Sequence, residues 1–340
     1  MANFDYYVEM ARKLSPLKAT PKVWNYLKYK TLRKQPEMLL SRYTPQIAHY
    51  FVTKRCNMDC DYCASGKYMK EGIRGWKESE ATLEKTKRIF ANPLFANCLL
   101  VDLVGGEPML VEDFDRIVAF LSDRGHMTNV ATNGIKLAER IADLKQAGIS
   151  RINVSYYDQN RPILERNLPV INGIFPVHMS FVMLRSVVEQ KPEHILEVAR
   201  FTKSAGAKSL RLWIYRPMGG NIHRDEIITD TNPAYLDMRQ RIDAALPGFC
   251  IWPEPIRMTQ LQKRCPQVWQ RVGCDPTGEM IICCGIDEPL KGENSNLFDA
   301  HPDVVYNHPT LVDMRKKLLD PESEPPDACK SCNLLGDPGW

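Results

Sequence analysis

The sequence lacks any apolar run long enough to span a bilayer, since its longest stretches, such as 98–104, cover only a few residues. It also lacks an excess of one charge, because 45 Lys and Arg against 41 Asp and Glu leave a net charge of +4. That balance argues against a nucleic-acid-binding or membrane-surface protein. The start of the chain, MANFDYYVEMARKL, has early acidic residues and no apolar core, so it is not a signal peptide. We predict a soluble, cytoplasmic protein without a membrane span or a nucleic-acid partner.

Cysteine is abundant, with 11 residues in a chain of 340. The cytosol keeps thiols reduced, so disulfides are not expected in such a protein. The grouping of the cysteines is more informative than their number, because three lie within 56–63 and two form a CxxC at 329–332. Such spacings are typical of metal sites.

The first 45 residues are basic, with nine Lys and Arg against three Asp and Glu, and aromatic residues are interleaved with the charges. We predict an N-terminal helical arm over residues 1–45 that packs on the main domain with its charges in water. A role in binding a partner or an anionic substrate is the alternative.

Strand-like and helix-like segments alternate regularly from residue 46 to residue 245. Such alternation implies right-handed crossovers and a parallel sheet, with helices that often end at glycine. Six repeats predict an α/β fold, either a partial (β/α)6 barrel or a doubly wound sheet, with ligands at the carboxyl ends of the strands. The predicted strands are 46–53, 99–105, 127–132, 151–157, 177–184 and 209–215.

The pattern changes after residue 245. Residues 246–264 are rich in proline and are predicted to form a linker. Residues 265–340 are rich in Cys, Gly, Asp and Pro, and we predict a small separate domain there. Within it, 270–284 is predicted to form a hairpin whose turn is 275–278, and 311–320 a short helix.

Cys56, Cys60 and Cys63 directly follow the first predicted strand. Three thiolates in a short loop can bind three irons of a cubane. The fourth iron is then open to a chelating ligand, much as catalytic zinc sites keep an open position. A zinc knuckle or unrelated thiols are the alternatives, but zinc favours paired CxxC arms and one arm here is CxxxC.

This C-x3-C-x2-C spacing resembles the signature of the radical S-adenosylmethionine (SAM) superfamily, and Tyr62 fits the aromatic residue before its third cysteine. The resemblance implies a 4Fe–4S cluster that binds SAM and cleaves it to a 5′-deoxyadenosyl radical, which takes hydrogen from a substrate. It also implies a flavodoxin- or ferredoxin-type electron donor.

Further motifs occur in the order that the superfamily has them, across residues 46–216. The resemblance implies that they contact the cofactor. The GGEP and TNG motifs and Arg185 also have local interpretations, as a turn, a helix cap and a solvated strand end respectively. Trp213 and Tyr215 fall near the expected adenine position, where core packing explains them equally well. The implied cofactor-binding residues are Tyr62, Gly105, Gly106 and Glu107 of a GGEP motif, Thr132 and Asn133 of a TNG motif, Ser155 and Arg185.

Four later cysteines form a second set, Cys265, Cys283, Cys329 and Cys332. Their spacing, with C-x12-G-x4-C before a CxxC, resembles the auxiliary-cluster region of the twitch and SPASM subfamilies. Because no cysteine follows the CxxC, we predict the twitch form with one auxiliary 4Fe–4S cluster. Structural zinc on the same thiolates is the alternative. Cys274 and Cys284 compete with Cys283, although adjacent side chains of a strand point to opposite faces.

These features predict a radical SAM oxidoreductase that oxidises or epimerises a small polar substrate such as a sugar, an aminocyclitol or a nucleoside. A maturase that acts on a ribosomal peptide is one alternative, and a non-catalytic iron–sulfur or zinc scaffold is another. Cys250 is a candidate hydrogen donor to the substrate radical, and the alternative is a small buried hydrophobic residue.

Overall fold

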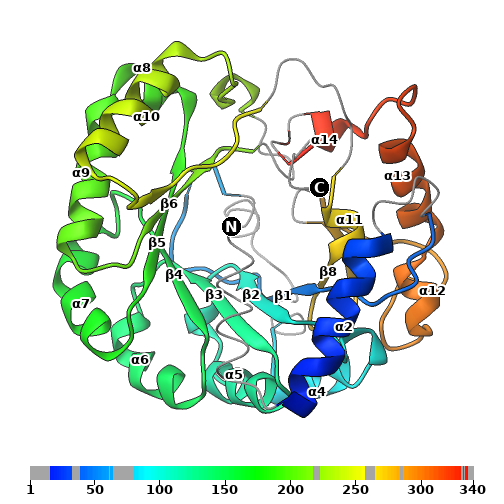
Figure 1. The fold of residues 1–340 in the computed structure, drawn as a ribbon. Coiled ribbons are helices and arrows are strands. Elements are labelled where there is room, and N and C mark those ends of the chain that lie inside the picture. The colour runs from blue at the N-terminus through cyan, green and yellow to red at the C-terminus, as the bar shows by residue number, and fades with distance from the viewer. Residues whose placement is uncertain are drawn as a thin grey trace.

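One curved sheet organises the protein (Figure 1). The computed structural model describes residues 16–32, 39–60, 62–63, 80–216, 223–256, 265–283, 286–330, 332 and 334–335. Within these ranges ten strands pair in the order β10-β9-β8-β1-β2-β3-β4-β5-β6-β7, and all pairs from β8 to β7 are parallel. The predicted α/β partial barrel is confirmed. In the described part of the chain no helix is long and apolar enough to cross a membrane.

All six strands predicted from the sequence are present, each within two residues of its expected bounds. The apolar residues that face the outer helices are buried, as the completely buried Ile152 and Val154 of β4 illustrate. The strands are β1 (Ile47–Thr53), β2 (Leu100–Gly105), β3 (Met127–Thr132), β4 (Arg151–Ser155), β5 (His178–Met183) and β6 (Leu210–Ile214).

Helices cover the outer face of this sheet (Figure 1). In α5 the buried residues Phe114, Ile117, Val118 and Leu121 follow the i, i+3, i+4, i+7 spacing of an amphipathic helix. Short 3-10 turns, η1 (Pro93–Phe95), η2 (Pro108–Leu110) and η3 (Arg224–Glu226), complete the connections. The helices are α4 (Leu83–Phe90), α5 (Phe114–Asp123), α6 (Leu137–Gln146), α7 (Arg161–Ile174), α8 (Arg185–Gln190), α9 (Pro192–Ser204) and α10 (Pro233–Ala245).

The inner face of the sheet is polar and partly open. On β4 the residues Arg151, Asn153 and Ser155 are partly exposed, while the residues between them are buried. The interior of a closed (β/α)8 barrel is instead filled by branched apolar side chains. The concave face of this sheet is therefore available to a polar ligand.

The C-terminal region continues the barrel sheet. The predicted hairpin is confirmed as β8 (Arg271–Cys274) and β9 (Met280–Cys283), and β8 pairs in parallel with β1. In the predicted linker, β7 (Cys250–Ile251) adds to β6, so both ends of the six-stranded core are extended. The domain boundaries themselves stay a prediction. The remaining elements are β10 (Ile286–Pro289), α11 (Gln267–Gln270), α12 (Pro302–Tyr306), α13 (Pro309–Leu319) and α14 (Asp327–Lys330).

The basic N-terminal segment contains helix α2 (Pro16–Leu32), which packs across the start of the sheet. Lys22 is buried, and its Nζ donates to the carbonyl oxygens of Cys98 (2.7 Å) and Ala96 (3.2 Å). Burial lowers the pKa of Lys22 to about 8. Tyr29, from the same helix, joins an apolar cluster that includes Trp269 and Cys265. Helix α2 thus contacts both the barrel and the C-terminal region.

Candidate cofactor and metal sites

The first three cysteines occupy one loop beyond the carboxyl end of β1. The backbone N–H of Cys63 donates to the carbonyl oxygen of Cys60 at 3.0 Å, which folds the loop back on itself. Burial first, and then the nearby thiols of Cys63 and Cys56, raise the pKa of Cys60 to about 12. Three sulfurs therefore share one small, half-buried space, which suits a cluster that binds them as thiolates.

The GGEP turn lies against the chain that leads into this loop. The N–H of Gly106 donates to the carbonyl of Thr53, and that of Glu107 to the carbonyl of Arg55, both at 2.7 Å. A Cβ atom on Gly106 would lie 2.1 Å from the oxygen of Arg55, and one on Gly105, where φ is +140°, would lie 2.2 Å from that of Thr53. Only glycine permits this approach.

Glu107 joins two turns to each other. Its carboxylate is buried, with Oε1 accepting from Thr132 Oγ1 (2.6 Å) and the N–H of Met109 (3.0 Å), and Oε2 accepting from the N–H of Asn133 (2.7 Å). Burial raises the pKa of Glu107, and these three hydrogen bonds oppose that shift. The structure therefore gives Glu107 a positioning role between the GGEP and TNG motifs.

Two asparagines extend this network to the neighbouring strands. Asn133 Nδ2 donates to Asn57 Oδ1 at 2.7 Å, which ties the TNG turn to the cysteine loop. Asn160, which the sequence analysis missed, is completely buried, and its Nδ2 donates to the carbonyl oxygens of Asn133 and Ser155, both at 2.8 Å. Its position just before an Arg-Pro helix start was the available signal. The carboxyl ends of β1 to β4 are thus held in one polar network.

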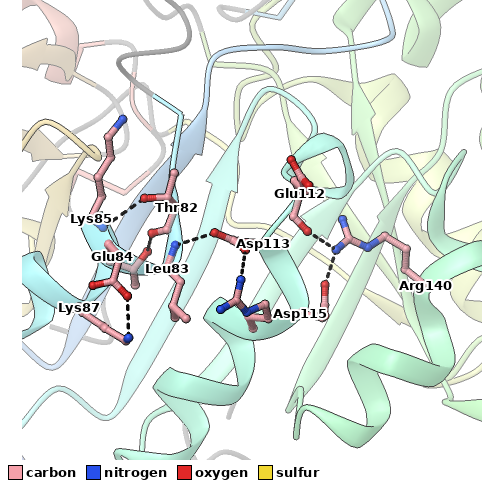
Figure 2. A network of polar contacts seen from close by, with 11 residues as sticks. Thr82, Leu83, Glu84, Lys85, Lys87, Glu112, Asp113, Asp115 and Arg140 are labelled. Carbon is pink, nitrogen blue, oxygen red and sulfur yellow. Dashed lines mark hydrogen bonds and ion pairs between the residues drawn. The ribbon is translucent and has the colours of Figure 1, made fainter.

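A second network fixes the GGEP segment from the outside (Figure 2). Arg140 of α6 donates through Nη1 to the carbonyl oxygen of Val111 (2.6 Å) and through Nη2 to Asp115 Oδ1 (2.5 Å). Asp113 Oδ2 accepts the N–H of Leu83 at the start of α4 (3.0 Å). The segment after the GGEP turn is therefore anchored to α4, α5 and α6.

A cavity of about 370 Å³ adjoins the cysteine loop. Its lining includes Cys60, Tyr62, Tyr157 and Lys191. The Tyr62 ring stacks on that of Tyr157, with centroids 6.1 Å apart, and meets the Tyr215 ring edge-on at 6.4 Å. Aromatic walls beside a polar rim suit a flat heterocycle. Tyr62, expected to contact the cofactor, thus lies beside Tyr215, expected near the adenine.

The other predicted cofactor contacts are more scattered. Ser155 Oγ lies 3.4 Å from Ser180 Oγ. Arg185 begins α8, is about half exposed, and pairs with Glu189 (Nε–Oε1 2.9 Å), so the structure shows it in a surface ion pair. Trp213 is exposed, with the Arg211 guanidinium over its ring.

Cys250 lies on β7, in register with the fully buried Leu210, and belongs to the main apolar core. In-register neighbours of parallel strands face the same side of a sheet, so Cys250 faces the helix layer. Burial raises the pKa of its thiol to about 12. This position argues against the predicted role as hydrogen donor, because a substrate on the inner face would be separated from the thiol by the sheet.

The second set of cysteines also gathers in one place. Burial raises the pKa of Cys265 well above its ordinary value, and the thiols of Cys332, Cys283 and Cys329 each raise it further. Cys274 is completely buried in the main core, near Asp275 and the buried thiol of Cys98. Cys274 is therefore separate from this set, and Cys284 lies outside the described residues.

By number and chemistry, four thiolates can ligate either a cubane or a single tetrahedral zinc ion. Within the ranges given above, no three His, Cys, Asp or Glu side chains are arranged closely enough to hold a single metal ion. Arg216, just after β6, donates from Nη1 to Cys332 Sγ at 3.8 Å. The set thus lies against the end of β6.

Comparison with known proteins gives a consistent result for the barrel. Residues 50–167 match the Radical SAM superfamily. The GTP 3′,8-cyclase of Acidothermus cellulolyticus is 32% identical over 167 residues, which are 44% of this chain and 46% of that protein. The enzyme of the same name from Aquifex aeolicus is 31% identical over 183 residues, covering 49% and 56%. The chain thus matches about half the length of these relatives.

Among solved structures, Streptococcus suis SuiB bound to S-adenosylmethionine superposes with a TM-score of 0.60. The match covers 85% of this chain and 72% of SuiB at 14% identity, which indicates a shared fold. The GTP 3′,8-cyclases named above do not test whether this protein is a dehydrogenase or an epimerase, so that reaction type stays a prediction. The twitch form of the C-terminal region also stays a prediction.

Proposed function

We propose that this protein is a radical SAM enzyme acting on a small polar substrate, since residues 50–167 match the Radical SAM superfamily. The observation that carries the proposal is the joining of the three-cysteine loop, the GGEP turn and the TNG turn at one end of the sheet. Cys56, Cys60 and Cys63 would hold a 4Fe–4S cluster whose open iron binds SAM. When bound, these two groups supply the one-electron cleavage that yields a hydrogen-abstracting radical.

The chain's own residues orient and shield this chemistry. Glu107 joins the two glycine-containing turns, and Asn133 ties them to the cysteine loop through Asn57. The rings of Tyr62 and Tyr215 are in place to pack on the adenine and exclude water. Ser155 faces the inner side of the sheet and is a candidate for a polar contact with the cofactor. Arg185 would have to leave Glu189 before it could bind the methionine carboxylate.

We assign the auxiliary 4Fe–4S cluster to Cys265, Cys283, Cys329 and Cys332 by the same reasoning. A cubane with four protein thiolates has no open iron, so it suits electron transfer better than substrate chelation. A flavodoxin- or ferredoxin-type protein would supply the electrons. The alternative of structural zinc predicts a different metal content and is tested below.

The substrate panel follows from the fold and the relatives. Nucleosides and nucleotides come first, because the relatives that match the barrel are named GTP 3′,8-cyclase. Sugars and aminocyclitols come next, with peptides as the alternative class. Product analysis then decides among oxidation, epimerisation and cyclisation.

Iron content and 5′-deoxyadenosine release test the proposal together. Anaerobic reconstitution should give about eight irons per chain, two cubanes of about four each. Replacing Cys56, Cys60 and Cys63 together by alanine should leave about four irons and abolish dithionite-driven release of 5′-deoxyadenosine. Cys274→Ala, a control in the core, should keep the full iron content. Release by the triple variant would refute the assignment of the SAM site, and zinc with about four irons would refute the auxiliary cluster.

A further inference from the structure

A row of hydrogen-bonded polar side chains crosses the inner face of the sheet, one from each of four adjacent strands. Asn153 Nδ2 of β4 donates to Asn129 Oδ1 of β3 (2.6 Å), and Asn129 Nδ2 donates to Asp102 Oδ1 of β2 (2.8 Å). His49 Nδ1 of β1 lies 3.4 Å from Asp102 Oδ2. The row lies at mid-strand on the inner face, and the cysteine loop and the two turns follow at the carboxyl ends of the same strands.

Arg271 joins this row from β8. Its Nη1 donates to His49 Nε2 (2.6 Å) and to Asp102 Oδ2 (3.4 Å). Its Nε is buried and has no hydrogen-bond partner among the described residues. The Nε and Nη2 groups form the edge with which a guanidinium grips carboxylate or phosphate oxygens. A buried donor without an acceptor is unfavourable, so this edge favours a bound anion.

Arg216 approaches the same place from the end of β6. The pKa of His49 is lowered to about 4, mainly by burial and then by the charges of Arg271 and Arg216. The nearby Asp102 carboxylate raises this pKa but does not outweigh them. The imidazole is therefore neutral, and both guanidinium charges lie near it. Asp102 is the one acidic residue in strands β1 to β6 and β8, whose arginines are Arg151, Arg211 and Arg271. These strands therefore contain three arginines against one carboxylate.

We infer that Arg271 and Arg216 bind a phosphate group of the substrate on the inner face of the sheet, beside Cys332. This inference rests on the proposed function, since it names the substrate class of that site. Two forked guanidinium groups offer more donors than a single carboxylate can use, whereas a phosphate has three terminal oxygens and a charge near −2. A cationic aminocyclitol would be repelled from this surface.

Binding of tripolyphosphate, GTP and guanosine to the reconstituted protein tests the inference by anaerobic calorimetry. Wild-type protein should bind tripolyphosphate and GTP, with affinity falling as salt rises, and should bind guanosine at least about tenfold more weakly than GTP. Arg271→Gln and Arg216→Gln should each weaken binding of both phosphates by about tenfold or more, and Arg271→Lys should restore only part of it. Arg116→Gln, which removes an exposed partner of Asp113, is the matched control and should bind as wild type does.

Equal tripolyphosphate affinity in both glutamine variants would overturn the inference, and so would guanosine binding as tightly as GTP. If Arg271→Gln fails to fold, Arg216→Gln decides, because Arg216 lies outside the polar row. Dithionite-driven cleavage of SAM without substrate separates this inference from the proposed function. If the glutamine variants still bind tripolyphosphate and still cleave SAM, only the phosphate site is refuted. If wild-type protein binds tripolyphosphate but never cleaves SAM, only the proposed function is refuted.

Discussion

Replacing Glu107 by alanine removes the acceptor of three hydrogen bonds at once. Two of the donors are backbone N–H groups, of Met109 and Asn133, and the third is the hydroxyl of Thr132. A buried donor left without a partner costs about 1–3 kcal/mol. The charge of the buried carboxylate is itself unfavourable, as its raised pKa indicates, and this offsets part of the loss. We therefore expect the free energy of unfolding to fall by about 3–5 kcal/mol.

Two milder variants grade the effect. Glu107→Gln keeps one oxygen but turns an amide group toward the other donors, which should cost about 1–3 kcal/mol. Thr132→Val removes a hydroxyl that donates to Glu107 and accepts from the N–H of Gly134 (3.0 Å), and should cost about 1–2 kcal/mol. Urea unfolding of the cluster-loaded protein, followed by circular dichroism, measures the change. A double-mutant cycle between Glu107 and Thr132 then isolates their coupling.

SAM affinity should fall in the same order, with alanine the weakest, glutamine next and valine the closest to wild type. The reason is that Glu107 holds the two turns in place, so the loss of binding follows the loss of order. An alanine variant with the urea midpoint and SAM affinity of wild type would refute this reasoning. Weaker SAM binding with unchanged stability would instead indicate direct contact between Glu107 and the cofactor.

Two further predictions concern backbone approach and acid stability. Gly106→Ala should prevent stable cluster loading, measured as iron content, because the new Cβ would lie 2.1 Å from a backbone oxygen. Gly173→Ala is the control, because its Cβ would meet nothing within 4 Å. This control variant should load the cluster normally and gain about 0.5–1 kcal/mol in free energy of unfolding. Burial lowers the pKa of three histidines, His49, His126 and His178, to between about 3 and 4. In the unfolded chain the pKa of a histidine is 6.5. Acidification from pH 6.5 toward 4 protonates the unfolded chain first, so the urea midpoint should fall across that window and be highest above it. His178→Gln should reduce the slope, and a midpoint that stays flat down to pH 5 would contradict the shifts.

The barrel was predictable because its strands are local apolar runs between helix-period segments. Helix α7 gives only a weak helix signal in the sequence, because Pro169 and the Asn172-Gly173 pair lie inside it. Tertiary packing of Leu164, Leu168 and Ile171 overrides these unfavourable residues.

Long-range pairing set the limit of the sequence analysis. Nothing local indicates that β8 pairs with β1 or that β7 pairs with β6, because strand partners are chosen by packing across the whole fold. The cysteine choice shows the same limit. Spacing alone left Cys274 as a competitor of Cys283, and burial in the core separates it from the second set.

The motif residues were identifiable, but their contacts were not. Glu107 was expected at the cofactor, whereas its carboxylate accepts from the neighbouring turn. Arg185 was expected beside the cofactor and lies in a surface pair with Glu189. A motif fixes which residue types are present near a site, and hydrogen-bond geometry decides which of them remain available to a ligand.

The pairing of β8 with β1 has a consequence for how the protein is made. One side of β1 receives its partner only after more than 200 further residues, since β1 ends at Thr53 and β8 begins at Arg271. A ribosome adds about 5–20 residues per second, so this edge stays open for roughly ten seconds or longer during synthesis. An unpaired strand edge is a template for aggregation, and contacts so distant in sequence form slowly. The cysteine loop after β1 spends the same interval beside an incomplete sheet, so stable cluster insertion is expected to follow translation of the C-terminal region.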